Sequence, residues 1–170
     1  PAVSIEEAVK KFVAESTAAW ASKDPKKHTA LYTPDAVVAI TGPKGWEEAK
    51  AADMEKSIGG YFTAFPDLEV TYTRVVARGN YAVAEWTFTG TNTGEMMGKP
   101  ATKKKVGYRA ASVLTFAKDG KVQRETSYFD MGTMMSQLGL GPKGQPARAV
   151  EAKPAGATVF MFGTDKDSDT

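Results

Sequence analysis

Residues 68–92 have the sequence LEVTYTRVVARGNYAVAEWTFTGTN, and this stretch is the clearest indication of a β-sheet in the chain. β-Branched and aromatic residues alternate with other residues on both sides of Gly79-Asn80. The alternation predicts two strands, Leu68–Arg78 and Tyr81–Asn92, because successive side chains of a strand point to opposite faces. The Gly-Asn dipeptide between them predicts a tight hairpin turn.

A two-residue turn determines which residues of this hairpin face one another. It places Arg74 opposite Glu85, and Thr73 opposite Trp86. The Arg74–Glu85 pair is then an ordinary cross-strand ion pair, which contributes little energy and carries no information about function.

A helical pattern opens the chain. Ser4 followed by Glu7 forms a capping box, and apolar residues recur at helical spacing as far as Trp20. These signals predict a first amphipathic helix from Ile5 to Ala21.

Three further elements are expected between this helix and the hairpin. Asp24-Pro25 predicts an N-cap and a first helical residue, which open a short helix through Tyr32. Residues 36–40 predict a strand. Residues 46–65 predict a second long helix, which ends before Pro66.

Strand periodicity continues after the hairpin. Residues 104–117 and 122–129 predict two strands joined at Lys118-Asp119-Gly120, and a short helix follows through Leu138. Helices followed by antiparallel strands predict an α+β fold, in which the helices pack on one face of a curved, mostly antiparallel sheet.

The register of the last hairpin decides which side chains share the space between the sheet and the helices. A two-residue loop pairs Leu114 with Glu125. A three-residue loop with Gly120 in the left-handed conformation pairs Phe116 with Val122 instead. We favour the second register because it gathers apolar residues of both strands on one face.

This register predicts an apolar cavity that holds one carboxylate. Asp130 ends opposite Tyr108 on the apolar face, whereas Glu125 turns to the other face. Trp86 and Phe88 of the neighbouring strand line the same concavity. Burial would raise the pKa of the Asp130 carboxyl, which suits a general acid or base. Such a cavity is typical of a site for a hydrophobic small molecule.

Asp130 also stands where the N-cap of the last helix belongs. A capping Asp accepts backbone N–H groups, stays ionised and is a poor proton donor. The sequence leaves the capping role and the catalytic role open.

Composition restricts the chemistry. The 170 residues have the size of one domain, and the absence of Cys excludes disulfides, thiolate metal sites and Cys nucleophiles. The single histidine, His28, excludes His-based metal clusters, and we expect it to be a half-exposed helix residue. A formal net charge of +2 does not favour nucleic acid as a partner, and no apolar run approaches the ~20 residues that span a membrane.

The ends of the chain carry weaker signals. Residues 1–140 are expected to form the domain, and residues 141–170 a linker-like C-terminal tail, because Gly, Pro and Ala interrupt all periodicity there. The alternative is that Val159–Phe162 forms an added edge strand, or part of a linker to a further domain. Position 1 is Pro, so either Met or a longer leader was removed. That start and the lack of Cys favour export, but the compartment stays open between cytoplasmic and exported.

Several short motifs occur in order along residues 4–139. They are Phe65-Pro66-Asp67-Leu68, the GTNTGEMMG run of residues 90–98, Asp119-Gly120-Lys121-Val122, and Tyr128-Phe129-Asp130 with Gln137-Leu138-Gly139. Together they resemble the SnoaL-like polyketide cyclases, or ester cyclases, of the NTF2-like superfamily. The resemblance implies a cone-shaped α+β barrel that is usually dimeric through its sheet.

The resemblance also implies a chemistry. Characterised members close rings by intramolecular aldol reaction without metal or cofactor, and use an Asp as acid/base. Asp130 best matches that Asp, and Glu125 is the other candidate. Family members often carry His where this chain has Asn92, which is a departure from the pattern.

We therefore expect a cofactor-free enzyme that acts on a hydrophobic carbonyl compound by proton abstraction, as cyclases and isomerases do. Asp130 is the expected acid/base, and Tyr108 and Asn92 are expected to orient the substrate or stabilise an enolate oxygen. The other expected pocket residues are Trp86, Phe88, Phe62, Tyr128 and Met135. The alternative is a non-catalytic module for small-molecule binding or dimerisation. A homodimer is expected in either case, since the strands carry apolar residues on both faces.

Overall fold

The computed structural model describes residues 1–42 and 44–163. The helices are α1 (Ile5–Ser22), α2 (Pro25–Thr29), the short 3-10 helix η1 (Ala51–Met54), α3 (Glu55–Ala64) and α4 (Met131–Gln137). The strands are β1 (Tyr32–Gly42), β2 (Gly45–Lys50), β3 (Glu69–Arg78), β4 (Tyr81–Thr91), β5 (Lys105–Phe116), β6 (Val122–Phe129) and β7 (Val159–Phe162). None of the helices in this described part has the length and apolar character needed to span a membrane.

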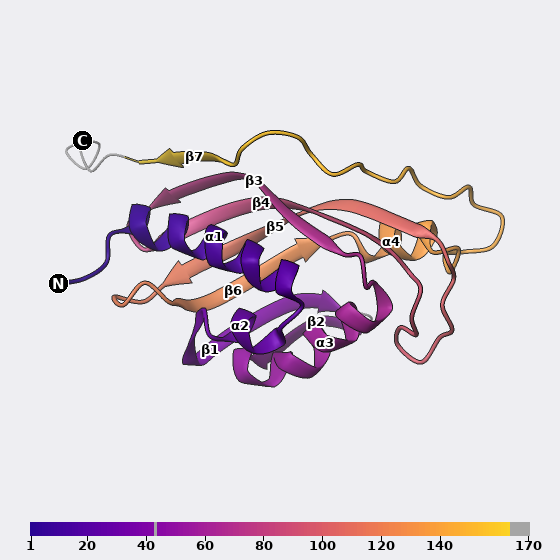
Figure 1. The fold of residues 1–170 in the computed structure, drawn as a ribbon, viewed down its shortest axis with the longest axis horizontal. Coiled ribbons are helices and arrows are strands. Elements are labelled where there is room, and N and C mark those ends of the chain that lie inside the picture. The colour runs from indigo at the N-terminus through magenta and orange to yellow at the C-terminus, as the bar shows by residue number, and fades with distance from the viewer. Residues whose placement is uncertain (43, 164–170) are drawn as a thin grey trace.

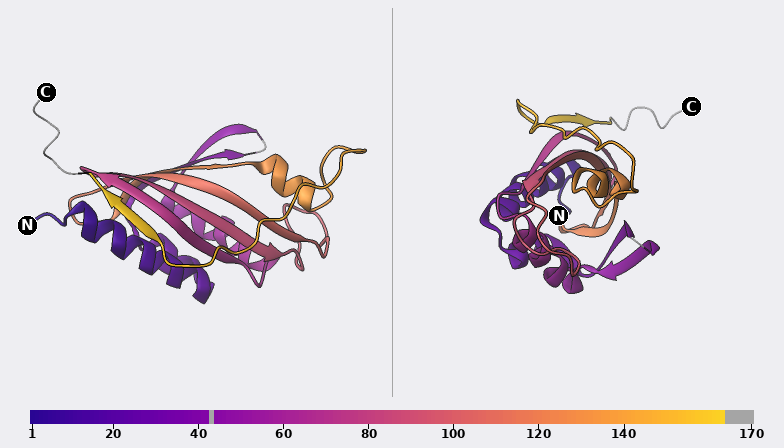
Figure 2. Two further views of the ribbon diagram at one scale, coloured as in Figure 1. Left: turned by 90° about the horizontal axis from the view of Figure 1, so that it is seen from above. Right: turned by 90° about the vertical axis from the view of Figure 1, so that its right-hand side faces the viewer.

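The strands form one sheet in the order β2-β1-β6-β5-β4-β3-β7, curved around the helices (Figures 1 and 2). Only the β1–β6 and β3–β7 pairs are parallel among the described residues. The predicted α+β class with a curved, mostly antiparallel sheet is therefore confirmed. The sheet stays open, because β2 and β7 lie at opposite edges, so it does not close into the expected cone-shaped barrel.

Helix α1 packs on the inner face of the sheet, as its sequence predicts. The Ser4 hydroxyl accepts the Glu7 backbone N–H, and the Glu7 carboxylate accepts the Ser4 N–H, which completes the capping box. The ring of Phe12 makes edge contacts with Tyr32 and Phe116, which joins α1 to β1 and β5. One helix thus contacts strands from both halves of the chain.

The region between α1 and the hairpin differs from its prediction. Helix α2 ends at Thr29, and Tyr32 already belongs to β1. The long helix expected over residues 46–65 is wrong in its first part, because residues 45–50 form β2. The backbone of β2 pairs antiparallel with β1, so sheet pairing overrides the helix propensity of the Glu-Glu-Ala-Lys run.

The β3–β4 hairpin contains a bulge. Arg74 faces Glu85 as expected, and their charged groups lie 3.8 Å apart on the surface. A register shift at Thr73 places Tyr72 opposite Trp86, so the expected Thr73–Trp86 pair is wrong. The bulge turns Tyr72 and Trp86 toward the same cavity.

A second bulge, in the β5–β6 pair, determines which residues of β6 face inward. Phe116 faces Val122 as predicted, but the register then shifts at Gln123, so that Leu114 faces Glu125. Beyond the bulge the strands follow the register that we did not favour. Glu125 therefore points inward, and Tyr128 points outward with 52% of its surface exposed.

The C-terminal segment is held against the sheet. From α4 the chain runs along the molecule to β7, which pairs in parallel with β3 (Figure 1). On the way, the Glu151 N–H donates to the Gly107 carbonyl at 3.0 Å, and the Gln137 amide donates to the Ala149 carbonyl at 2.5 Å. The expectation of a loose tail is wrong for Val159–Phe162, which forms the edge strand of the alternative interpretation.

Candidate functional site

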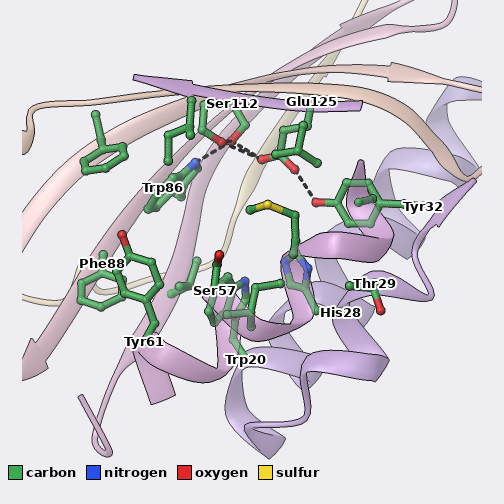
Figure 3. Close-up of a pocket in the computed structure, with 18 of the residues that line it drawn as sticks. Trp20, His28, Thr29, Tyr32, Ser57, Tyr61, Trp86, Phe88, Ser112 and Glu125 are labelled. Atoms are coloured by element: carbon green, nitrogen blue, oxygen red, sulfur yellow. Dashed lines mark hydrogen bonds between the residues drawn. The ribbon is translucent and has the colours of Figure 1, made fainter. Parts of the chain in front are cut away.

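A cavity of about 130 Å³ lies between the helices and the inner face of the sheet (Figure 3). Most of its lining is aromatic or aliphatic. The lining residues are Trp20, His28, Thr29, Tyr32, Val38, Ile40, Ala51, Met54, Ser57, Ile58, Tyr61, Val70, Tyr72, Trp86, Phe88, Tyr108, Ser112, Glu125, Ser127 and Phe129.

The aromatic rings form two separate walls. The first wall consists of Trp20, His28, Tyr32 and Tyr72, which join one another directly or through Phe12. The second wall consists of Tyr61, Trp86, Phe88, Tyr108 and Phe129. No aromatic pair within residues 1–42 and 44–163 joins one wall to the other. A bound molecule would therefore contact aromatic residues of two groups, which adjoin where Tyr72 of β3 is paired with Trp86 of β4.

Hydrogen bonds connect Glu125 to both walls, directly to the first and through Ser112 to the second. Its Oε2 accepts the hydroxyl of Tyr32 in the first wall. Its Oε1 accepts the hydroxyls of Ser112 at 2.7 Å and Ser127 at 2.9 Å. The Ser112 hydroxyl in turn accepts the Trp86 Nε1–H of the second wall at 3.0 Å (Figure 3).

This network leaves one position open on the carboxylate. Each carboxylate oxygen offers two acceptor positions. Two hydroxyls occupy Oε1, whereas Oε2 receives one, from Tyr32. The second position of Glu125 Oε2 is thus available to a proton from a bound molecule.

The tyrosines around the carboxylate stay protonated. Burial raises the pKa of Tyr32 well above its ordinary value, and the charge of Glu125 raises it further. Burial and the same charge also raise the pKa of Tyr72, whose hydroxyl lies 2.8 Å from that of Ser16. In the second wall, burial and the neighbouring Tyr61 raise the pKa of Tyr108. These hydroxyls therefore carry a proton at neutral pH, and that of Tyr32 donates it to Glu125 in a hydrogen bond.

His28 is buried in the first wall, so the expectation of a half-exposed helix residue is wrong. It is 9% exposed, stacks on Tyr32 at 5.6 Å and meets the edge of Trp20 at 4.8 Å. Burial lowers the pKa of His28, while the charge of Glu125 opposes that change. Its Nδ1 is enclosed and has no hydrogen-bond partner within the described chain.

Three of the predicted pocket residues line this cavity, namely Trp86, Phe88 and Tyr108. Asn92 does not. It is 1% exposed, but its amide donates to the Ala64 and Gly94 carbonyls and accepts the Thr102 N–H. Asn92 thus holds the loop after β4 against the end of α3, and no part of it lines the cavity.

The remaining predicted pocket residues also lie elsewhere. Phe62 and Met135 pack against the core without lining the cavity. Tyr128 lies on the outer face, where its ring approaches that of Trp46 at 6.2 Å. The bulge at Gln123 explains Tyr128, because it reverses the faces of all later residues of β6.

Asp130 lies outside the cavity. Its carboxylate accepts the Thr133 backbone N–H at 3.1 Å and the Thr133 hydroxyl at 2.7 Å, which makes it the N-cap of α4. It also forms an exposed ion pair with Arg148. The hydrogen bonds from Thr133 lower the pKa of Asp130, so the expected raised pKa and the position opposite Tyr108 are both wrong.

The sequence contains one signal for the carboxylate of the cavity. Glu125 and Ser127 alternate along β6, and Ser112 lies across on β5, so these polar groups gather on one face. We expected Ser112 on the inner face but assigned Glu125 and Ser127 to the outer face, because the bulge was not anticipated. Within the described residues, no three His, Asp or Glu side chains gather as a metal site requires.

An open α+β sheet around a cavity between two aromatic walls defines a class of small-molecule-binding proteins with the NTF2-like, ketosteroid isomerase-like fold. Within that class, the chain belongs to the SnoaL-like polyketide cyclase family, whose family model matches residues 10–138. The family predicted from the sequence motifs is thereby confirmed.

Solved structures agree with this assignment. The chain is similar to AclR, a proposed hydroxylase from Streptomyces galilaeus, with 30% identity over 84% of this chain and 87% of that one, and a TM-score of 0.71. IdmH, a proposed polyketide cyclase from Streptomyces antibioticus, shares 24% identity over 76% and 97% of the two chains, with a TM-score of 0.65. A SnoaL-like protein from Jannaschia shares 20% identity over 84% and 99%, with a TM-score of 0.68. The last two likenesses concern the fold alone. Among curated proteins the comparison finds no match.

Proposed function

We propose that the protein catalyses proton transfer on a small hydrophobic carbonyl compound, with Glu125 as the general acid/base. The observation that carries this proposal is the open acceptor position of Glu125 Oε2 inside an aromatic cavity. Glu125 is the only carboxylate among the lining residues of the described chain. Asp130, the residue expected for this role, is the exposed N-cap of α4 and lies outside the cavity.

The proposed proton transfer uses two polar groups of the cavity, the Glu125 carboxylate and the Tyr108 hydroxyl. Glu125 Oε2 takes a proton from the carbon next to the substrate carbonyl, and the C–H electron pair moves onto the carbonyl oxygen as an enolate. The hydroxyl of Tyr108 donates a hydrogen bond to that oxygen. In a conjugated substrate the enolate takes the proton back from Glu125 on a different carbon of the conjugated system. Otherwise its α-carbon forms a bond to a second carbonyl carbon, and the oxygen of that carbonyl takes the proton from Glu125. The first outcome is an isomerisation and the second an aldol ring closure, and neither needs an added electron acceptor.

The hydroxyls around Glu125 also suit this role. Tyr32, Ser112 and Ser127 hold the carboxylate in one orientation without a cationic partner. Hydrogen bonds from neutral hydroxyls also favour an ionised carboxylate, but an Arg or Lys partner would add a full positive charge and weaken the base further. The three hydroxyls position the carboxylate for proton transfer.

The size of the cavity bounds the substrate. Its volume of about 130 Å³ is close to the roughly 150 Å³ of an engineered apolar cavity that holds benzene. The cavity therefore encloses about one ring, and a larger polyketide would place its reacting ring inside and the remainder outside. Ser57 lies at an exposed position of α3 and lines the cavity, so the opening lies on that side.

The experiment follows exchange of the α-hydrogens of cyclohexanone for deuterium, measured by NMR in D₂O. The wild-type protein is expected to accelerate exchange, and Glu125→Gln to reduce that rate by about 100-fold or more. Binding of the ketone should remain similar in that variant. Asp130→Asn is the matched control and should keep the wild-type rate.

The same experiment tests the alternative of a non-catalytic binding module. Binding of the ketone by the wild-type protein without faster exchange would reject the enzyme and favour the module. Equal loss of rate in Asp130→Asn would reject Glu125 as the base.

We also propose a homodimer formed through the outer face of the sheet. Val76 and Met161 are paired across β3 and β7 and are 45% and 43% exposed. Val83 and Val113 continue this apolar row across β4 and β5. Sedimentation should give a dimer at micromolar concentration, and Val83→Lys should give a monomer. A monomeric wild-type protein would contradict the proposal.

A further inference from the structure

We propose that His28 donates a hydrogen bond to a second oxygen of the ligand, so that the site selects ring compounds with acceptor oxygens at both ends. The inference rests on the proposed function for the place of the first oxygen, at Tyr108. It adds a residue and a ligand class to the site: cyclic dicarbonyl compounds and their hydroxy-ketone relatives.

The two aromatic walls place the two donors apart. His28 belongs to the first wall, through its contacts with Trp20 and Tyr32. Tyr108 belongs to the second wall, through its stacking on Phe88 at 5.2 Å. Both residues line the cavity and belong to different walls, so we infer that a ligand in the cavity can meet a donor from each. Figure 3 shows His28 on the helical side, across the cavity from Glu125.

The protonation state makes His28 a donor through Nε2. Because burial lowers its pKa, the imidazole is neutral at neutral pH and carries one N–H. Nδ1 is enclosed and has no partner within the described residues, so a proton there would be a buried donor without an acceptor. An unpaired buried N–H is less favourable than an unpaired acceptor, so this environment favours the proton on Nε2. Because His28 lines the cavity and its Nδ1 is enclosed, we place the Nε2–H toward the ligand.

No side-chain hydrogen bond within the described residues holds His28 in its buried position. Buried polar side chains are nearly always hydrogen-bonded, since an unpaired buried donor or acceptor reduces stability. His28 is held by ring packing against Trp20 and Tyr32, while Glu125 is bonded by Tyr32 and two serines. A ligand oxygen at Nε2 would give the imidazole a hydrogen bond through its other nitrogen, while Nδ1 stays an unpaired acceptor. A ligand with a single oxygen would leave either His28 or Tyr108 unpaired.

The first test compares two probes with the same ring, cyclohexane-1,4-dione and cyclohexanone. The wild-type protein should bind the dione about tenfold more tightly, which corresponds to one additional hydrogen bond. His28→Phe keeps an aromatic ring in the wall but removes the donor, and should abolish that preference. His28→Gln retains an N–H donor and should restore part of it. Equal binding of both probes by the wild-type protein would overturn the inference.

The second test uses the wild-type protein alone, so it does not depend on the folding of a variant. His28 is the single histidine of the chain, and ¹⁵N labelling of histidine therefore gives one pair of ring signals. The signals should report a proton on Nε2, and the Nε2 signal should shift when the dione is added. A proton on Nδ1, or an Nε2 signal that the dione leaves unchanged, would overturn the inference.

The two proposals can fail separately. Loss of α-hydrogen exchange with the dione preference intact would reject the proposed catalysis and keep His28 as a binding residue. Exchange without any dione preference would reject the role of His28 and keep the catalysis. Glu125→Gln should retain the preference for the dione, because that variant removes the base and leaves both donors in place.

Discussion

Glu125 lies within β6 and Asp130 directly follows that strand, yet their surroundings are opposite. Glu125 faces a cavity and is bonded by the neutral hydroxyls of Tyr32, Ser112 and Ser127. Asp130 faces solvent and is bonded by a backbone N–H and a guanidinium. The backbone register, rather than the residue type, determines which carboxylate faces the cavity.

The different surroundings also give the two carboxylates different roles. The cap bonds of Asp130 stabilise its ionised form, which suits a structural anion at a helix start. Neutral donors around Glu125 leave its open acceptor position facing the ligand space. A variant that changes the length of the Glu125 side chain should therefore affect activity. A variant that removes the Asp130 carboxylate should instead affect stability.

The largest expected effect comes from shortening Glu125. Glu125→Asp keeps the carboxyl but withdraws it by one methylene, and a misplacement of this size reduces rates by about 100-fold. Asp130→Glu lengthens the other carboxylate and should leave the rate of ketone α-hydrogen exchange unchanged. The measurement is the same deuterium exchange followed by NMR. Similar losses in the two variants would remove the distinction between the two carboxylates.

A smaller effect is expected on stability. Ser112→Ala leaves the buried Trp86 N–H without its acceptor and removes a donor to Glu125, and should lower the free energy of unfolding by about 1–3 kcal/mol. Asp130→Ala removes the cap of α4 and should lower it by about 1 kcal/mol. Urea unfolding measures both. Ketone binding should weaken in Ser112→Ala only, and the reverse pattern would contradict our assignment of the site.

The smallest expected effect is a loss of stability in two stages on acidification. Burial lowers the pKa of His28 below its ordinary 6.5, so its contribution is complete above that pH and is lost as pH falls toward the folded pKa. The pKa of Asp130 is lowered below 3.8, so its contribution is lost only at a still lower pH. Thermal unfolding as a function of pH measures both stages. His28→Phe should lack the first stage, and an unchanged profile would contradict the buried neutral imidazole.

Local signals predicted most of the secondary structure. The capping box located the start of α1, and residues 122–129 were expected as the strand that β6 forms. These features depend on neighbours in the sequence, which a single chain displays directly. The helix expected from residue 46 was wrong, because β2 exists through its pairing with β1 and not through its own propensity.

The candidate site was harder to predict for the same reason. The extra residue at Gln123 carries no Gly or other local mark, yet it turns Glu125 inward and Tyr128 outward. His28 looked like a surface residue of a short helix, and only the packing of α2 against α1 and α3 buries it. Trp86, Phe88 and Tyr108 line the cavity as predicted. They belong to β4 and β5, and the two bulges lie in β3 and β6, so the bulges do not change which way these side chains face.

The parallel pairing of β1 with β6 has a consequence for the order of folding. Strands β3, β4 and β5 follow one another as hairpins and pair with neighbours in the sequence. Val38 of β1 pairs with Glu125 itself, so this contact closes a loop that contains about half of the chain. Contacts across such long loops form late, because the loop must lose much of its conformational entropy first. The hairpins can therefore assemble before the cavity does, and a nascent chain acquires its site only after β6 has been synthesised and has joined β1.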